Sequence, residues 1–242
     1  MKKGTLYGVG VGPGDPKLIT VKGREVIGAC RHVFAPKARI KAESLALQIA
    51  GRYAGPDAQI HEVVFPMVED ESVLERHWSE CAAGIVALLD AGDDVCFLTL
   101  GDTLLYSTHI YLVRAVKALS PAASVVNIPG VNAYSAAAAL TGFPLGEGKK
   151  PLLVIPVSDD LEVVREAIDG DRTVVLMKVG KRLPEIVALL EARGLACRSV
   201  FVARAGLEGE RIETDLTKLK GKGEALGYLS VILIPAERRA TP

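Results

Sequence analysis

The strongest constraint on the fold is a stretch in which an apolar strand ends abruptly at a glycine followed by an acid. The residues from Val95 to Leu100 are apolar except for Thr99, a pattern typical of a strand covered on both faces. Gly101 lets the backbone approach a ligand closely, and Asp102 is suited to cap a following helix. Open α/β proteins bind small molecules at the carboxyl ends of such strands, but the same residues also fit an ordinary strand-to-helix turn.

The same pattern recurs along the chain, because other short apolar strands also end in glycine-containing turns. These turns are Gly12–Asp15, Pro129–Gly130 and Arg204–Gly206. Strands alternate with helical patterns between them, which predicts an α/β fold. Backbone amides and carbonyls at strand ends suit recognition of a polar, flat ligand. This favours group transfer, in which the protein mainly positions two reactants.

The first glycine-rich loop differs from a dinucleotide-binding loop. Gly10, Gly12 and Gly14 give the spacing G-x-G-x-G, and Pro13 and Pro16 remove two backbone donors near the helix start. Binding of NAD or FAD is therefore disfavoured. The sequence has no Walker motif, no G-x-S-x-G motif and no zinc-ligand spacing, so we predict no metal site on its side chains.

Composition limits the partners of the chain. Lys plus Arg and Asp plus Glu each number 29 among 242 residues, and this balance argues against a broad basic face for nucleic acid. The N-terminus fits a strand rather than a signal peptide, and no apolar run reaches the roughly 18 residues of a membrane span. The four cysteines contain no C-x-x-C pair. We predict a cytoplasmic protein with reduced thiols that binds neither membrane nor nucleic acid.

The regular pattern breaks at residues 142–150, which we take as a junction between two lobes. The prediction is an N-terminal α/β lobe over residues 1–142 and a C-terminal α/β lobe over residues 143–242. A ligand is expected in the cleft where the strand ends of both lobes meet. Residues 131–140 predict a helix of small side chains that packs against either a sheet or a flat ligand. Strands are expected at 152–157, 173–179, 199–203 and 228–234, with helices at 161–168 and 183–192.

Three longer motifs follow one another in the chain. They are G-x-G-P-G-D-P-x-L-x-T from Gly10 to Thr20, L-G-D-x-L-L-Y-S-T from Leu100 to Thr108, and P-G-V-x-A-x-S-A-A-A from Pro129 to Ala138. Together they resemble the tetrapyrrole methyltransferase superfamily, the class III enzymes that use S-adenosylmethionine. The resemblance covers nearly the whole chain and implies two α/β lobes with mixed sheets and an active site in the inter-lobe cleft. Thr103 stands where the superfamily usually has proline, and Asn132–Ala133 replaces a usual pair of Ser or Thr.

Within the superfamily, the ending Leu105–Thr108 and the strand Thr173–Val179 are most similar to enzymes that methylate C20 of precorrin-2 or cobalt-precorrin-2 in cobalamin synthesis. The resemblance implies C-methylation by S-adenosylmethionine, release of S-adenosylhomocysteine, and a homodimer. One alternative is a sister class III methyltransferase acting on another tetrapyrrole carbon or on a non-tetrapyrrole acceptor. The other is a non-catalytic module that binds a small molecule.

The resemblance also implies which residues bind the cofactor. Main-chain carbonyls and an acid would face its positive charges, and apolar side chains would face its adenine. The matching positions are Pro13, Leu100, Gly101, Asp102, Thr103, Leu105, Asn132, Ala133, Met177, Ala205, Gly206 and Pro235.

Two residues are predicted to act on the substrate. Asp15 either orients the substrate and removes a proton after methyl transfer, or caps its own turn. Tyr106 either hydrogen-bonds the substrate or packs at the loop exit. The resemblance also implies a tetrapyrrole substrate rich in acetate and propionate carboxylates, which would need cationic side chains to bind them. Each candidate cation also fits an ordinary solvated charge on the surface. The candidate cations are Lys37, Arg39, Lys149, Lys150, Arg204 and Arg211.

Overall fold

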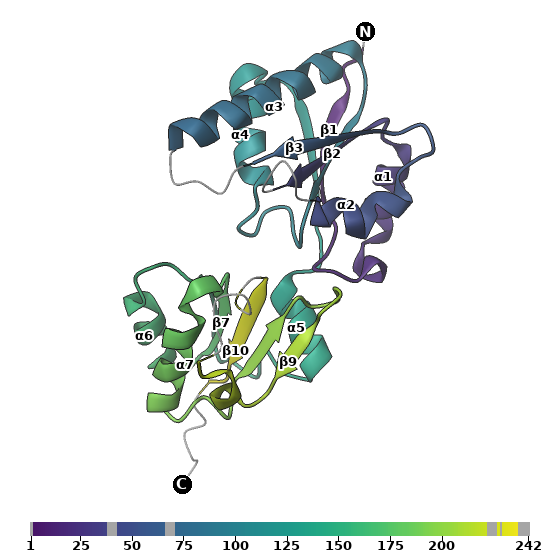
Figure 1. The fold of residues 1–242 in the computed structure, drawn as a ribbon. Coiled ribbons are helices and arrows are strands. Elements are labelled where there is room, and N and C mark those ends of the chain that lie inside the picture. The colour runs from purple at the N-terminus through teal and green to yellow at the C-terminus, as the bar shows by residue number, and fades with distance from the viewer. Residues whose placement is uncertain (1, 38–42, 66–70, 222–226, 228, 237–242) are drawn as a thin grey trace. The chain divides into compact units, whose positions relative to one another are not determined.

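The chain contains two compact units, each built around its own five-stranded sheet (Figure 1). The computed structural model describes residues 2–37, 43–65, 71–221, 227 and 229–236. The units are Met1–Asn132 and Ala133–Pro242. The helix predicted at 131–140 is α5 (Ala133–Thr141), and it belongs to the second unit.

The strands of the first unit pair in parallel, in the order β3-β2-β4-β1-β5. All five residues of β4 are buried, as expected for a strand covered on both faces. Parallel pairing brings the carboxyl ends of β4, β1 and β5 to one edge as neighbours. The strands are β1 (Thr5–Gly10), β2 (His32–Lys37), β3 (Gln59–Val64), β4 (Val95–Thr99) and β5 (Ser124–Ile128).

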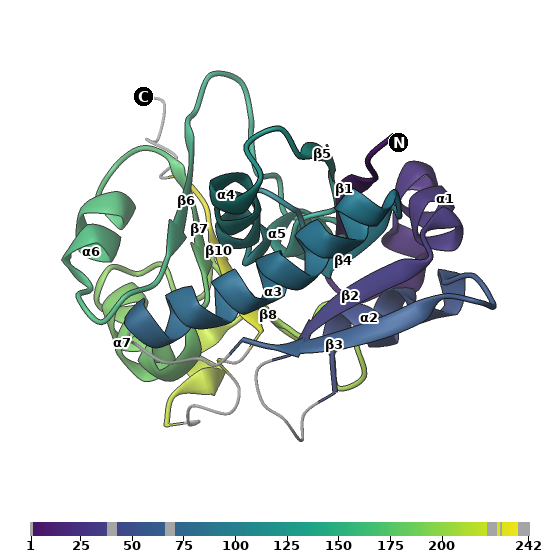
Figure 2. The same ribbon diagram turned by 90° about the horizontal axis from the view of Figure 1, so that it is seen from above.

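Helices cover both faces of the first sheet. Helices α3 and α4 pack together on one face, and α1 and α2 lie on the other (Figures 1 and 2). Thr20 caps α1, because its Oγ1 accepts a hydrogen bond from Gly23 N at 3.0 Å. The helices are α1 (Val21–Ala29), α2 (Leu45–Ala50), α3 (Glu71–Ala91) and α4 (His109–Leu119), with 3₁₀ turns η1 (Pro16–Leu18) and η2 (Gly51–Tyr53).

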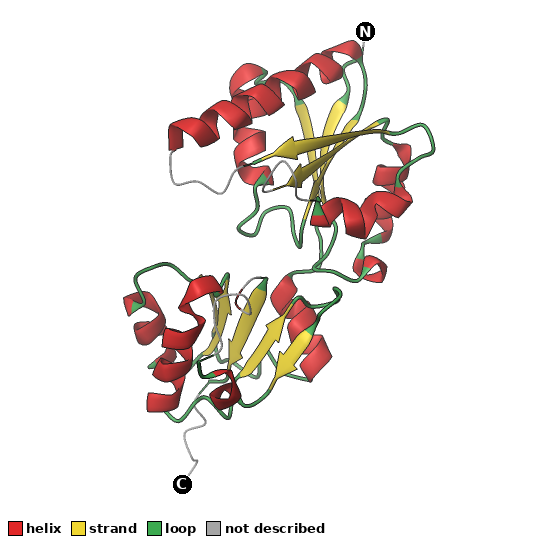
Figure 3. Cartoon of the chain, viewed as in Figure 1, coloured by secondary structure: helices red, strands yellow, loops and turns green. Residues whose placement is uncertain are grey.

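The second sheet is mixed and has the order β6-β7-β10-β8-β9 (Figure 3). Strand β6 pairs with β7 in parallel, whereas β10 runs antiparallel to both β7 and β8. Helix α5 covers one face, and α6 and α7 cover the other. The elements are β6 (Leu152–Pro156), α6 (Glu162–Ile168), β7 (Thr173–Met177), η3 (Gly180–Arg182), α7 (Leu183–Ala192), β8 (Val200–Ala203), β9 (Arg211–Glu213), η4 (Leu216–Leu219) and β10 (Ser230–Ile234).

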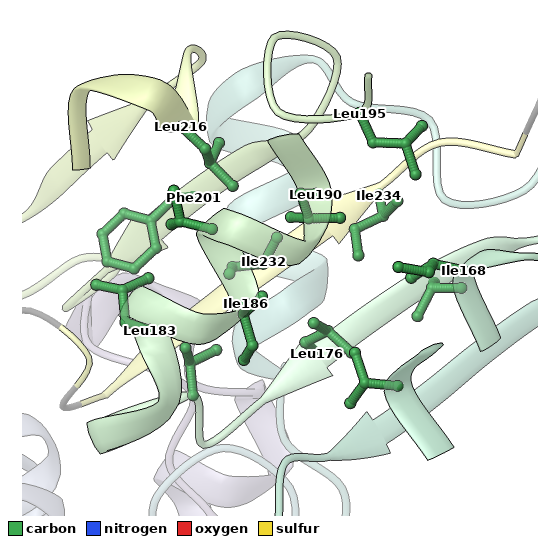
Figure 4. Packing of buried hydrophobic residues seen from close by; sticks show 14 of the residues in the cluster. Ile168, Leu176, Leu183, Ile186, Leu190, Leu195, Phe201, Leu216, Ile232 and Ile234 are labelled. Carbon is green, nitrogen blue, oxygen red and sulfur yellow. The ribbon is translucent and has the colours of Figure 1, made fainter. Parts of the chain in front are cut away.

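The core of the second unit lies between its sheet and α7. Ile186 and Leu190 of α7 pack among strand residues that include Leu176, Phe201 and Ile232 (Figure 4). All five side chains are fully buried, so the hydrophobic effect fixes α7 on this face.

One predicted strand is too long, because β7 ends at Met177 rather than at residue 179. Lys178 adopts φ +55°, and a left-handed residue cannot continue an extended strand. Of the helices in the described ranges, none combines the length and apolar character that crossing a membrane requires.

Candidate functional site

Four glycines gather where β1, β4 and β5 end, and we call Gly10, Gly12, Gly101 and Gly130 the glycine junction. Gly101 N donates to Gly12 O at 2.8 Å, and Gly12 N donates to Gly101 O at 3.2 Å. A Cβ on Gly130 would lie 2.1 Å from Gly101 O, and one on Gly10 would lie 2.6 Å from the same oxygen. Gly12 and Gly101 also have φ of +80° and +71°. Gly10 and Gly130 have no room for a side chain, because backbone approaches backbone directly. Gly12 and Gly101 adopt the left-handed conformation that glycine takes up without strain.

The Asp102 carboxylate ties the junction together. Its Oδ2 accepts from Gly130 N at 3.0 Å, and its Oδ1 accepts from Leu104 N at 2.9 Å. The prediction that Asp102 caps the following helix is wrong, because α4 begins only at His109. Asp102 instead caps its own turn and joins the β4 loop to the β5 loop. Each oxygen keeps a lone pair beyond its backbone contact.

The loop between β4 and α4 has buried and exposed positions in alternation. Thr103 is 1% exposed and Ser107 is buried, and Ser107 Oγ lies 3.0 Å from Thr99 Oγ1. Leu104 and Tyr106 are 56% and 41% exposed. The loop thus presents two apolar or aromatic side chains to solvent. Because Thr103 is buried, a ligand at this loop would meet its backbone rather than its hydroxyl.

The other predicted site residues near this edge of the first sheet differ in burial and in hydrogen bonding. Pro13 is buried, and Leu100 and Leu105 are half-buried. Asp15 Oδ1 accepts from Lys17 N at 2.8 Å and so caps η1, the structural alternative that the sequence left open. Asn132 and Ala133 are half-buried and fall on either side of the division between the two units.

The second unit has its own distinctive edge, which we call the strained edge and which comprises Lys178, Arg204 and Leu229. Lys178 follows β7, Arg204 follows β8 and Leu229 precedes β10. Because β10 is antiparallel to its two neighbours, these three positions lie at one end of the sheet. Their φ values are +55°, +53° and +53°, each costing about 1–2 kcal/mol for a side-chain-bearing residue. Such strain concentrates at functional sites.

Three predicted cofactor residues lie at the strained edge. Met177 immediately precedes Lys178 and is half-buried, and Ala205 follows Arg204 and is buried. Gly206 N donates to Glu210 Oε2 at 2.7 Å. Sequence reasoning missed Lys178 and Glu210, since no local pattern marks a left-handed lysine or a carboxylate bond across a loop. Pro235 does not join this group, because β10 carries it to the opposite end of the sheet, where Ile234 pairs with Val174.

Several candidate cations already have protein partners. Lys37 Nζ lies 3.2 Å from Glu62 Oε2, and Lys150 Nζ lies 2.8 Å from Asp171 Oδ1. Arg204 Nε donates to Glu208 O at 2.7 Å. Lys149 is exposed, Arg211 is half-buried, and Arg39 lies outside the described residues.

The cysteines are poorly suited to nucleophilic chemistry. Burial raises the pKa of Cys30 and of Cys81 to about 12, and it raises the pKa of Cys96 well above its usual range. A hydrogen bond to Asp215 raises the pKa of the exposed Cys197. These thiols therefore stay protonated near neutral pH. Nowhere in the described ranges do three or more His, Cys, Asp or Glu side chains come together to hold a metal ion.

Two features point to the class of this protein: strand ends that converge on glycine backbone, and two α/β units whose four cysteines all have raised pKa values. The chain belongs to the Tetrapyrrole (Corrin/Porphyrin) Methylases, whose family model matches residues 5–220.

Individual relatives match almost end to end. The chain is 35% identical to a cobalt-precorrin-2 C(20)-methyltransferase of Salmonella typhimurium, with 96% of each chain covered. It is 32% identical to a probable cobalt-precorrin-2 C(20)-methyltransferase of Methanocaldococcus jannaschii, with 97% of each covered. It is 31% identical to a precorrin-2 C(20)-methyltransferase of Sinorhizobium sp, covering 96% of this chain and 95% of the relative.

Solved structures share the fold. A cobalt precorrin-4 methyltransferase gives a TM-score of 0.73 at 20% identity, with 96% of this chain and 94% of that one covered. A uroporphyrin-III C-methyltransferase of Thermus thermophilus, solved with S-adenosylhomocysteine, gives 0.63 at 22% identity, with 96% and 97% covered. The predicted class III architecture, with two α/β units, is therefore confirmed.

The close approach at the glycine junction predicts that Gly130→Ala is destabilising. The added methyl overlaps Gly101 O, so the β4 and β5 loops must separate, at a cost of about 1–3 kcal/mol in the free energy of unfolding. Gly84→Ala is the matched control, because nothing lies within 4 Å of a Cβ there and the residue sits inside α3. We expect it to stabilise by about 0.5–1 kcal/mol. Urea denaturation measures both, and equal stability of the two variants would contradict the packing described.

Proposed function

We propose that this protein transfers a methyl group from S-adenosylmethionine to C20 of precorrin-2 or cobalt-precorrin-2. The observation that carries the proposal is the end-to-end match to enzymes named for that reaction, over 95% or more of both chains. The glycine junction supports it, because it offers converging backbone groups at the carboxyl edge of a parallel sheet. The reaction belongs to cobalamin synthesis, and we place it in the cytoplasm.

The residues at the glycine junction fit the proposed cofactor. Its sulfonium and ammonium groups are cationic, and the Asp102 carboxylate is held in place by two backbone amides. Gly101 has no side chain that would keep a ligand from the backbone. Half-buried Leu100 and Leu105 supply apolar surface for a purine. In the second unit, Met177, Ala205 and Gly206 are proposed to contribute further contacts, with Pro13, Thr103, Asn132 and Ala133 completing the set.

When bound, S-adenosylmethionine supplies an activated methyl group for a nucleophilic carbon. The chain's own work is then positional: it holds the donor, orients the acceptor and keeps water away. The protonated state of the cysteines agrees with this, since no covalent enzyme intermediate is required. Leu104 and Tyr106, exposed on the loop beside Asp102, are proposed to face the macrocycle. Asp15 is proposed to orient the substrate or to accept a proton after transfer.

The proposed reaction is tested with purified protein, methyl-labelled S-adenosylmethionine, and either precorrin-2 or cobalt-precorrin-2. We expect one labelled methyl group at C20 of the product, located by NMR. The rates on the two acceptors decide which is the natural substrate. A methyl group at another ring position would leave the family intact and overturn the C20 assignment. Tight binding of S-adenosylhomocysteine without transfer to either acceptor would contradict the enzymatic proposal.

Removal of the Asp102 carboxylate tests its proposed contact with the cofactor. Asp102→Ala deletes the acceptor for Gly130 N and Leu104 N together with the negative charge. We expect affinity for S-adenosylhomocysteine to fall about tenfold or more by calorimetry. Asp94→Ala is the matched control, because Asp94 Oδ1 accepts from Thr5 N at 2.7 Å at the start of β1.

The control should lose stability without losing affinity. If Asp102→Ala binds as tightly as wild type, the carboxylate organises the loop without contributing to cofactor binding.

We further propose that the protein is a homodimer, as the resemblance to its superfamily implies. Light scattering at micromolar concentration should give twice the mass of the 242-residue chain. A monomer under these conditions would refute the proposal.

A further inference from the structure

His109 is a fully buried histidine that spans three strands of the first sheet. It is the first residue of α4 and is 0% exposed. Phe97, Gly8 and Asn127 form one row across β4, β1 and β5. The imidazole stacks on Phe97 with ring centroids 5.8 Å apart, and its Nε2 lies 2.8 Å from Asn127 Oδ1. A Cβ on Gly8 would lie 2.1 Å from Nε2, so the ring crosses β1 only because residue 8 is glycine.

The backbone of the same residue secures the loop that precedes it. His109 N donates to Ser107 Oγ at 3.0 Å, and Ser107 Oγ lies 3.0 Å from Thr99 Oγ1 at the end of β4. All three residues are buried. His109 therefore connects the end of the loop to β4 through its backbone and to β5 through its side chain. The strands it joins are those whose ends form the glycine junction.

We infer that His109 is a positioning residue that holds the loop Leu100–Thr108 against the glycine junction and thereby sets the geometry of the proposed cofactor site. The inference rests on the proposed function only where it concerns the cofactor. It assigns no contact between His109 and a ligand, since the imidazole acts through the loop. Loss of its bond to Asn127 frees α4 and the loop to shift along the sheet.

The surroundings of the ring favour the neutral imidazole. Asn127 Oδ1 accepts a hydrogen bond from Nε2–H in the tautomer that this geometry favours, and His109 Nδ1 has no hydrogen-bond partner in the described part of the chain. Burial lowers the pKa of His109 below its ordinary value of 6.5, and the hydrogen bond to Asn127 opposes this. Phe97 on β4, Gly8 on β1 and Asn127 on β5 carry no ionisable group.

The lowered pKa of His109 fixes how the stability of the fold changes with pH. A histidine whose pKa is lower in the folded state is neutral there, while the unfolded chain binds a proton more readily. The contribution of neutral His109 to the free energy of unfolding is complete above pH 6.5, the ordinary pKa of histidine. It is lost progressively as the pH falls below 6.5. The free energy of opening the loop should therefore decrease in mild acid, and hydrogen exchange of its amides should accelerate.

The first experiment measures hydrogen exchange at the amides of Leu104 and Gly130, both of which donate to Asp102. His109→Leu removes the donor to Asn127 but keeps an apolar side chain. We expect exchange at these two amides to accelerate about tenfold. His32→Gln is the matched control, because His32 is also buried but bonds His61 of β3 from the amino-terminal end of β2. It should leave both amides protected.

The second experiment uses His109→Gln, whose amide nitrogen replaces Nε2 and cannot titrate. We expect it to restore protection and to bind S-adenosylhomocysteine as wild type does, whereas His109→Leu binds about tenfold more weakly. Between about pH 7.5 and about pH 5.5, the free energy of opening at Leu104 and Gly130, obtained from hydrogen exchange, should fall for wild type and for His32→Gln but stay constant for His109→Gln.

The outcomes separate this inference from the proposed function. Wild-type protein that fails to bind S-adenosylhomocysteine would overturn the proposed function, while hydrogen exchange still tests the positioning role. Unchanged exchange at Leu104 and Gly130 in His109→Leu, or the same acceleration in His32→Gln, would overturn the positioning role. A pH dependence of that opening free energy that persists in His109→Gln would overturn the role of the neutral imidazole. If His109→Leu does not fold, the His109→Gln and His32→Gln comparisons decide.

Discussion

The first unit depends on the hydrogen bonds between the Asp102 carboxylate and the backbone amides of Gly130 and Leu104. They join the loops that leave β4 and β5, which are separated in the sheet by β1. For the two loops to meet in this way, their backbones must be in direct contact, so Gly10 and Gly130 cannot carry a side chain. A charge-assisted hydrogen bond is stronger than a neutral one, which makes this carboxylate a suitable clamp.

The proposed activity depends on the groups that lie exposed beside the Asp102 carboxylate. Three parallel strands deliver backbone amides and carbonyls to one edge, and the loop beyond Asp102 presents Leu104 and Tyr106 to solvent. The second unit adds an edge where Lys178 and Arg204 adopt left-handed backbone. Neither edge provides a strong nucleophile. Both suit the binding and alignment of reactants, which is what methyl transfer between two small molecules asks of a protein.

Much of the fold was predictable from the sequence because local rules agreed with one another. Helix α7 begins and ends where predicted, and Thr20 caps α1. The errors arise from long-range contacts that no local pattern carries. Asp102 bonds Gly130, 28 residues away, and does not cap α4. Pro235 follows an apolar strand like the others, but antiparallel pairing of β10 places it at the opposite end of the sheet from Met177, and its contact with the cofactor stays a prediction.

The most direct test of the account is a crystal structure of the protein with S-adenosylhomocysteine. We predict the ligand at the glycine junction, in contact with the backbone of Leu100 and Gly101 and with its ammonium group near the Asp102 carboxylate. The hydrogen bond from Gly130 N to Asp102 should persist. A ligand bound without contact to residues 100–102 would contradict the claim that the methyl donor binds at the glycine junction.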